Sequence, residues 1–100
     1  MEIQVLYFAG CPNAEAAQAR VLEAAAGLPD VTVVTQQVDS PEDAERAGMR
    51  GSPTILVDGV DLFAEPGTEM SWACRLYRDP HGTAAGVPSV DQLTQALTPR

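Results

Sequence analysis

The stretch IQVLYFAGCPNAEAAQARVLEAA, residues 3–25, carries an apolar run, one cysteine and an alanine-rich segment in immediate succession. The apolar run over residues 3–8 predicts a strand. In the segment that follows, apolar residues recur at intervals close to 3.6 and predict one helical face, formed by Ala14, Ala17, Val21, Leu22 and Ala25. Cys11 lies where the strand gives way to the helix. Pro12 suits the first helical position, because its missing N–H would have no partner there.

The position of Cys11 near a helix N-cap has a chemical consequence. Backbone N–H groups and the helix dipole favour an anion at such a position. A thiol pKa lowered from ~8.5 to ~6.5 would raise the thiolate share at pH 7 from about 3% to about 75%. We therefore expect a redox-active or metal-binding thiol at Cys11. The alternative is an inert, buried cysteine that packs as a small apolar side chain.

A second informative segment is GSPTILVDGVDLF, residues 51–63. Its Asp58-Gly59 pair lies between two apolar runs, which predicts a hairpin. Pro53 is tolerated at the first residue of the strand that begins there. A cis Ser52–Pro53 bond would turn the chain sharply at this point.

Three further elements are expected along the chain. The β-branched run at residues 31–38 is long enough for a buried central strand. A short helix is expected to begin with Ser40 as its N-cap and to end at Gly48. The last helix begins with a capping box formed by Ser89 and Gln92. The strand at residues 3–8 and the strand at residues 31–38 are joined through a helix, and such a connection is right-handed and gives a parallel strand pair.

Taken together, these elements resemble the thioredoxin-like superfamily. Cys11-Pro12-Asn13-Ala14 is similar to the glutaredoxin-type Cys-Pro-x-Cys motif, with Ala14 in place of the last cysteine, and Ser52-Pro53-Thr54 is similar to the family's cis-proline segment. The resemblance covers residues 1–63 and 88–98. It implies a single α/β domain over residues 1–100, with a four-stranded mixed sheet, flanking helices, and an insertion at about residues 64–87 before the C-terminal helix.

The resemblance also implies roles for site residues. Cys11 would be the attacking thiol, Pro53 would shape its pocket, and the substrate would be bound by Pro12, Asn13, Ser52 and Thr54. Because Ala14 replaces the second motif cysteine, exchange within the motif is excluded. The resolving thiol is then a small thiol such as glutathione or mycothiol, or the distant Cys74. The insertion leaves the sheet near the cis-proline segment, so Cys74 is in reach if the two Cα atoms come within about 7 Å.

Composition restricts the partners and the compartment. The formal net charge of −8 argues against nucleic acid and anionic membrane surfaces, which attract basic patches. No apolar stretch approaches the ~20 residues that span a bilayer. No secretory signal is visible at the start, so we expect a cytoplasmic protein with reduced thiols. A monomer is expected, or a weak dimer paired through a sheet edge.

The function expected from these observations is thiol-based redox chemistry with a protein or a small thiol as partner, and without a resident cofactor or metal. The alternative is a non-catalytic thioredoxin-like binding domain for a protein partner, or for a soft metal such as mercury, zinc or copper(I) held by Cys11 and Cys74. His81 lies in a turn and is expected to be exposed. The acidic side chains are expected to be solvated, namely Asp39, Glu42, Asp43, Glu45, Asp58 and Asp61.

Overall fold

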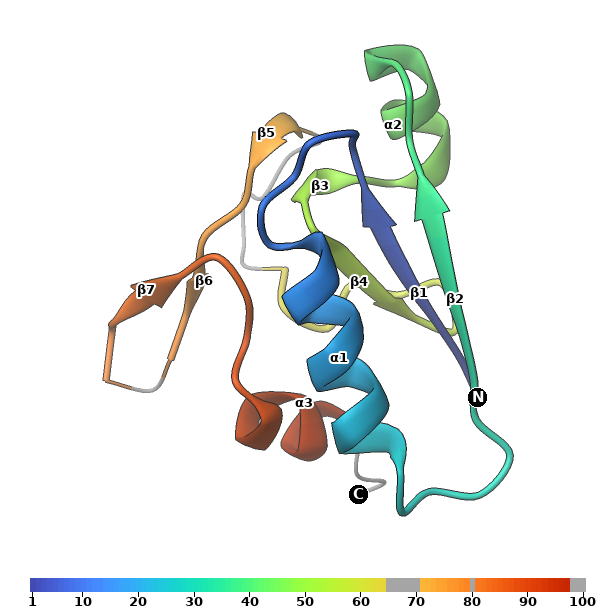
Figure 1. Cartoon of the computed structure of the whole chain (residues 1–100), viewed down its shortest axis with the longest axis vertical. Helices are drawn as coiled ribbons and strands as arrows, with labels where there is room; N and C mark the ends of the chain where they lie inside the picture. The colour runs from blue at the N-terminus through green and yellow to red at the C-terminus, as the bar shows by residue number, and fades with distance from the viewer. Residues whose placement is uncertain (65–70, 80, 98–100) are drawn as a thin grey trace.

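The computed structural model describes residues 1–64, 71–79 and 81–97, and in these it shows a mixed α/β fold with a mixed sheet and three helices (Figure 1). The elements in chain order are β1 (Glu2–Tyr7), α1 (Ala14–Ala25), β2 (Thr32–Gln37), α2 (Pro41–Ala47), β3 (Arg50–Ser52), β4 (Thr54–Val57), β5 (Ser71–Cys74), β6 (Tyr77–Arg78), β7 (Ala84–Ala85) and α3 (Val90–Leu97). None of the helices in this part of the chain is long and apolar enough to cross a membrane.

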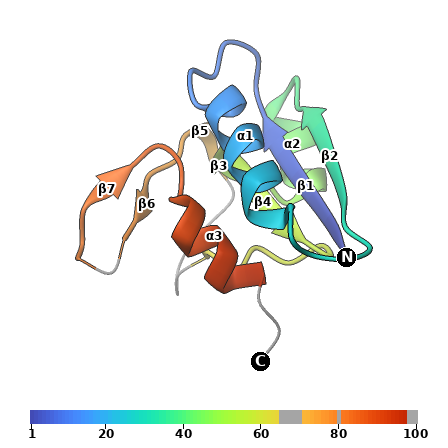
Figure 2. The ribbon, with the colours of Figure 1, turned by 60° about the horizontal axis from the view of Figure 1, so that its bottom comes forward.

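The main sheet has the strand order β2-β1-β4 in the described residues. β1 and β2 are parallel, as expected for a crossover through α1, and their register runs unbroken from Glu2 opposite Thr32 to Tyr7 opposite Gln37. β4 returns antiparallel to β1. Helices α1 and α3 lie together on one face of this sheet, and α2 lies at one end of the opposite face (Figure 2).

Alternation along β1 creates two apolar cores, because successive side chains of a strand point to opposite faces. Ile3 and Val5 pack with Val21 of α1 and Leu93 of α3 in the larger core. Leu6 points to the other face. The smaller core on that side consists of Leu6, Val38, Ala44, Met49 and Leu56.

Several local predictions are confirmed. Ser40 caps α2 by accepting a hydrogen bond from the amide of Asp43, and Gly48 ends that helix at φ +80°. Ser89 and Gln92 exchange the two hydrogen bonds of a capping box at the start of α3. The predicted helical face of α1 is correct except for Leu22, which is half exposed because no described element covers that side of the helix.

The expected four-stranded sheet is not found, since the described part of the main sheet has three strands. After Asp58 and Gly59 the chain makes a single bridge between Val57 and Val60 and then leaves the sheet. The side chain of Tyr77, from the insertion, lies beside β4 in place of a fourth strand. The hydroxyl of Tyr77 is hydrogen-bonded to the backbone of Ile55, on the side where a fourth strand would lie.

The expectation of a buried central strand at residues 31–38 is wrong. β2 is the outer strand of the sheet, and four of its last five residues are exposed, including Val34 at 38% of its surface. β-branched residues favour an extended backbone, but they do not determine whether a strand is central or outer.

The insertion expected at about residues 64–87 is described for residue 64 and from residue 71 onward, apart from residue 80. These described residues form three short strands, β5, β6 and β7. β5 pairs parallel with β3, and β6 pairs antiparallel with β7. The insertion therefore adds β structure to the edge that carries the cis-proline segment.

Candidate functional site

Cys11 lies in the loop that joins β1 to α1. Its amide donates to the carbonyl of Phe8 at 3.2 Å, and its carbonyl accepts from the amide of Ala14 at 3.4 Å. Helical hydrogen bonding begins only with Asn13, whose carbonyl accepts from Ala17 at 2.9 Å. The N-cap is thus Asn13, and Cys11 precedes it by two residues. The expectation of Pro12 at the first helical position is wrong for the same reason, since Pro12 belongs to the preceding turn.

The side chain of Asn13 lies against Gly86, which precedes α3. A Cβ atom added to Gly86 would come within 2.2 Å of Asn13 Nδ2. Asn13 is half-buried and makes no side-chain capping bond to α1. This side chain therefore packs the start of α1 against the C-terminal part of the chain.

The peptide bond between Ser52 and Pro53 is cis, as the sequence predicts. Both hydroxyls around it are buried and bonded to the backbone. Ser52 Oγ accepts from the amide of Phe8 at 3.2 Å. The hydroxyl of Thr54 accepts from the amide of Arg50 at 2.9 Å and donates to the carbonyl of Gly51 at 2.5 Å. Ser52 and Thr54 therefore position the cis-proline segment, and Ser52 also holds the loop that carries Cys11.

β5 brings Cys74 next to this segment. The Cα atom of Cys74 is the strand partner of Ser52, and the amide of Arg75 donates to the carbonyl of Ser52 at 3.0 Å. Gly51 makes this approach possible, because a Cβ atom there would lie 2.8 Å from Arg75 Cβ. Gly51 also has a φ of +101°, which other residues rarely adopt.

The loop that carries Cys11 and strand β5 lie side by side in both views of the fold (Figures 1 and 2). Phe8 and Trp72 connect them, with ring centroids 5.4 Å apart. A pocket of about 320 Å³ adjoins this contact and is lined by Phe8, Ala9, Val38, Asp39 and Trp72. Cys11 is half-buried, Cys74 is exposed, and both are free thiols. One end of the molecule thus carries both cysteines and the cis-proline segment.

A buried charged cluster behind this site was missed by sequence reasoning. Asp61 accepts two hydrogen bonds from Arg75, at 2.5 and 3.2 Å, and both residues are 8% exposed. The expectation that Asp61 is solvated is therefore wrong. The two residues are separated by 14 positions and belong to no local pattern, so no sequence signal marks the pair.

Tyr77 completes this cluster. The guanidinium carbon of Arg75 lies 4.5 Å from the centroid of the Tyr77 ring, within the range of a cation–π contact. The hydroxyl of Tyr77 donates to the carbonyl of Pro53 at 2.5 Å. Burial raises the pKa of Tyr77 well above its usual value, and the positive charge of Arg75 offsets part of this rise. The cluster therefore fixes the carbonyl of the cis-proline to the insertion.

Neither metal ligands among the described residues nor similarity to a known protein indicates what the site does. Within residues 1–64, 71–79 and 81–97, no group of three or more His, Cys, Asp or Glu side chains could hold a metal ion. His81 is exposed, as the sequence predicts. Comparisons with family models, with curated proteins and with solved structures found no match for this chain.

Proposed function

We propose that this chain is a thioredoxin-like redox protein in which Cys11 is the reactive thiol. The observation that supports the proposal best is the meeting of three separate segments at one end of the fold. Ser52 Oγ binds the amide of Phe8 in the loop that carries Cys11, and the strand partner of Ser52 is Cys74. A reactive thiol beside a cis-proline segment, with a second thiol on the neighbouring strand, is an arrangement suited to thiol–disulfide exchange.

The proposed reaction proceeds in two exchange steps. The Cys11 thiolate attacks one sulfur of a disulfide, forms a mixed disulfide, and releases the other sulfur as a thiolate. A second thiolate then attacks the mixed disulfide and frees the remaining half of the substrate. If that thiolate is Cys74, the protein ends with a Cys11–Cys74 disulfide and the substrate leaves reduced. If it is a small thiol that attacks the half bound to Cys11, Cys11 is released as a thiolate and a new small disulfide leaves.

The pairing of β5 favours a small disulfide as the substrate. In the family that this chain resembles, the backbone before the cis-proline pairs with an extended segment of a protein substrate. Here the carbonyl of Ser52 already accepts from the amide of Arg75 at 3.0 Å. A disulfide of a small thiol such as glutathione or mycothiol needs no strand pairing at this edge. Two free thiols also fit a reducing compartment such as the cytoplasm.

The test is reaction with glutathione disulfide, followed by intact mass at neutral pH, in wild type and the two single-cysteine variants. Cys74→Ser is expected to accumulate one glutathione on Cys11. Wild type is expected to pass through that adduct to an internal disulfide. Cys11→Ser is expected to react at the rate of the unfolded chain. The proposal fails if Cys74 reacts faster than Cys11, or if folding accelerates neither thiol.

A second candidate is a non-catalytic binding domain of the same fold. The observation that favours it is Ala14 at the first position of α1, where a dithiol enzyme of the resembled family carries its second cysteine. Such a domain would leave both thiols no more reactive in the folded chain than in the unfolded one. The same mass measurement therefore separates the two candidates.

A further inference from the structure

We propose that the outer edge of β2 binds an extended, cationic segment of another protein by adding it as a further strand to the sheet. The proposal does not depend on the thiol chemistry at Cys11. It rests on the free backbone groups of β2, on a pocket beside it, and on the charges at its two ends.

The register of β2 determines which backbone groups are free. The amide of Thr32 donates to the carbonyl of Met1 at 3.0 Å, and the amide of Val38 donates to that of Tyr7 at 2.7 Å. The backbone N–H and C=O groups of successive strand residues point alternately to the two sides of the strand. The even-numbered residues of β2 therefore bond to β1. The N–H and C=O groups of Val33, Thr35 and Gln37 therefore point away from the sheet. They offer three donors and three acceptors in a straight row.

Within the described residues, other segments protect the opposite edge of this sheet but not the edge of β2. Beside β4, Val60 pairs with Val57 and the hydroxyl of Tyr77 bonds to Ile55. β2 has none of the features that usually prevent pairing at an edge, which are charged side chains, prolines and bulges. Its sequence, TVVTQQ, is uncharged, and its pairing with β1 is continuous.

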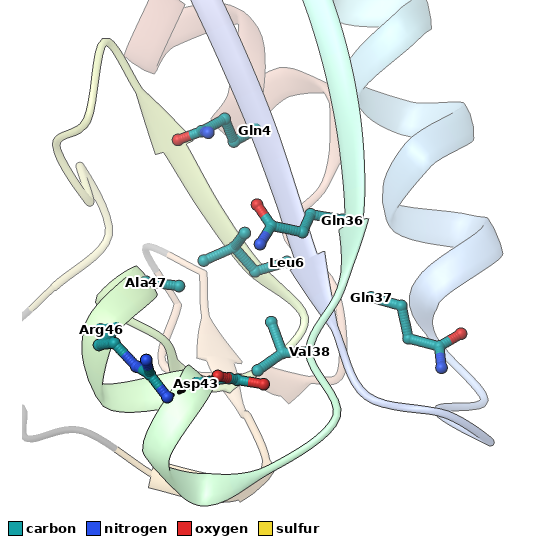
Figure 3. Close-up of a pocket in the computed structure, with 8 residues that line it drawn as sticks. All are labelled: Gln4, Leu6, Gln36, Gln37, Val38, Asp43, Arg46 and Ala47. Atoms are coloured by element: carbon teal, nitrogen blue, oxygen red, sulfur yellow. Dashed lines mark hydrogen bonds and ion pairs between the residues drawn. The ribbon is translucent and has the colours of Figure 1, made fainter.

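A pocket of about 430 Å³ lies beside this edge, between the sheet and α2 (Figure 3). Leu6 and Val38 are its buried apolar residues. The amides of Gln4 and Gln36 lie on the same face of the sheet, whereas Gln37 points to the opposite face (Figure 3). Alternate side chains of an added strand would extend over this face and could enter the pocket. Backbone pairing combined with pockets for alternate side chains is the usual basis of peptide recognition by strand addition.

The charges around β2 select the partner. Asp30 and Asp39 flank the strand and are exposed. Arg46, on the helix beside the pocket, is already bonded to Asp43 at 3.0 Å. The amino group of Met1 is bonded to the backbone carbonyl of Asp30 at 3.0 Å. A segment with a lysine or arginine near each end therefore complements this edge.

Net charge argues against a second copy of this chain. A two-fold pairing through β2 would bring together two chains that each carry a net charge of −8, and these repel each other. A cationic foreign segment avoids this repulsion.

The probe is a fluorescent peptide, acetyl-KTVTVTK-amide, whose binding is followed by anisotropy at low salt. Its controls are acetyl-ETVTVTE-amide and a version of the basic peptide that is N-methylated at alternate residues. We expect the basic peptide to bind roughly tenfold more tightly than either control. Amide hydrogen exchange on the wild-type protein should slow at Val33, Thr35 and Gln37, while the amides of Thr32 and Val38, which already bond to β1, should not change.

Thr35→Pro removes one outward donor at a position where an edge strand tolerates proline, and it should abolish peptide binding. Thr35→Val keeps the amide and should bind as wild type. Equal binding of the acidic and basic peptides, or binding that leaves the three outward amides unprotected, overturns the proposal whether or not the proline variant folds. A dimer in the absence of peptide that Thr35→Pro dissociates overturns it in favour of self-association.

Discussion

The hydroxyl of Tyr77 bonds to the carbonyl of Pro53 at 2.5 Å and so connects the insertion to the cis-proline segment. Tyr77 is 4% exposed, and its hydroxyl is also hydrogen-bonded to the backbone of Ile55. Burial raises the pKa of this phenol because the phenolate would lose its hydration. The folded protein therefore holds Tyr77 in its neutral form.

This relationship predicts a loss of stability at high pH. In the unfolded chain Tyr77 releases its proton above a pH of about 10, whereas in the folded chain it keeps the proton to a higher pH. Its contribution is thus complete below pH ~10, and above it the free energy of unfolding should fall by about 1.4 kcal/mol per pH unit. Urea unfolding of wild type and Tyr77→Phe across this range measures the slope. Tyr7→Phe, which removes the other tyrosine, is the control. The same slope in wild type and Tyr77→Phe contradicts this account.

The ion pair between Asp61 and Arg75 predicts a large effect from a small substitution. Asp61→Asn removes the charge that both Arg75 and, at 3.8 Å, Arg50 face. It leaves the buried guanidinium of Arg75 uncompensated, so we expect a loss of about 3–5 kcal/mol of stability in urea unfolding. Asp43→Asn breaks an exposed pair with Arg46 and should change stability by less than about 1 kcal/mol. Similar losses in the two variants contradict the assignment of Asp61 to a buried pair.

Gly51 and Gly59 provide a matched test of how β5 is held. Both have positive φ, +101° and +82°, so alanine strains the backbone at each position. Only at Gly51 does the added Cβ meet another residue, because it would lie 2.8 Å from Arg75 Cβ. We expect Gly51→Ala to lose at least about 1 kcal/mol more stability than Gly59→Ala. The fluorescence of Trp72, the chain's single tryptophan, should also shift to the red in Gly51→Ala as β5 separates from Phe8. Equal effects at the two positions argue against close packing of β5 on β3.

The parts of the fold that the sequence predicts are those with local causes. The caps of α2 and α3 follow from hydrogen bonds between Ser40 and Asp43 and between Ser89 and Gln92, three residues apart. The cis bond at Pro53 is predicted by the similarity of Ser52-Pro53-Thr54 to a cis-proline segment, and proline is the residue that readily allows a cis bond. The parallel pairing of β1 with β2 follows from the right-handed crossover through α1.

The parts that the sequence does not predict depend on contacts between distant segments. Whether β2 is central or outer is decided by the path of the chain after Gly59, where Val60 makes one bridge and the sheet ends. The burial of Asp61 depends on Arg75, which comes close only because β5 packs on β3. The position of Cys11 relative to α1 is decided by a turn hydrogen bond between its carbonyl and Ala14, which displaces the helix start by two residues. Composition and periodicity contain none of these contacts.

The most direct test of the proposed function is the rate at which iodoacetamide alkylates Cys11 in Cys74→Ser, compared at neutral pH between the folded protein and the same protein unfolded in urea. The proposed redox role predicts that Cys11 reacts roughly tenfold faster in the folded protein, because thiol–disulfide exchange requires a nucleophilic sulfur that a reagent can reach, and Cys11 is only half-buried. A folded protein in which Cys11 reacts no faster than in the unfolded chain contradicts the redox role and identifies Cys11 as an inert, packed thiol.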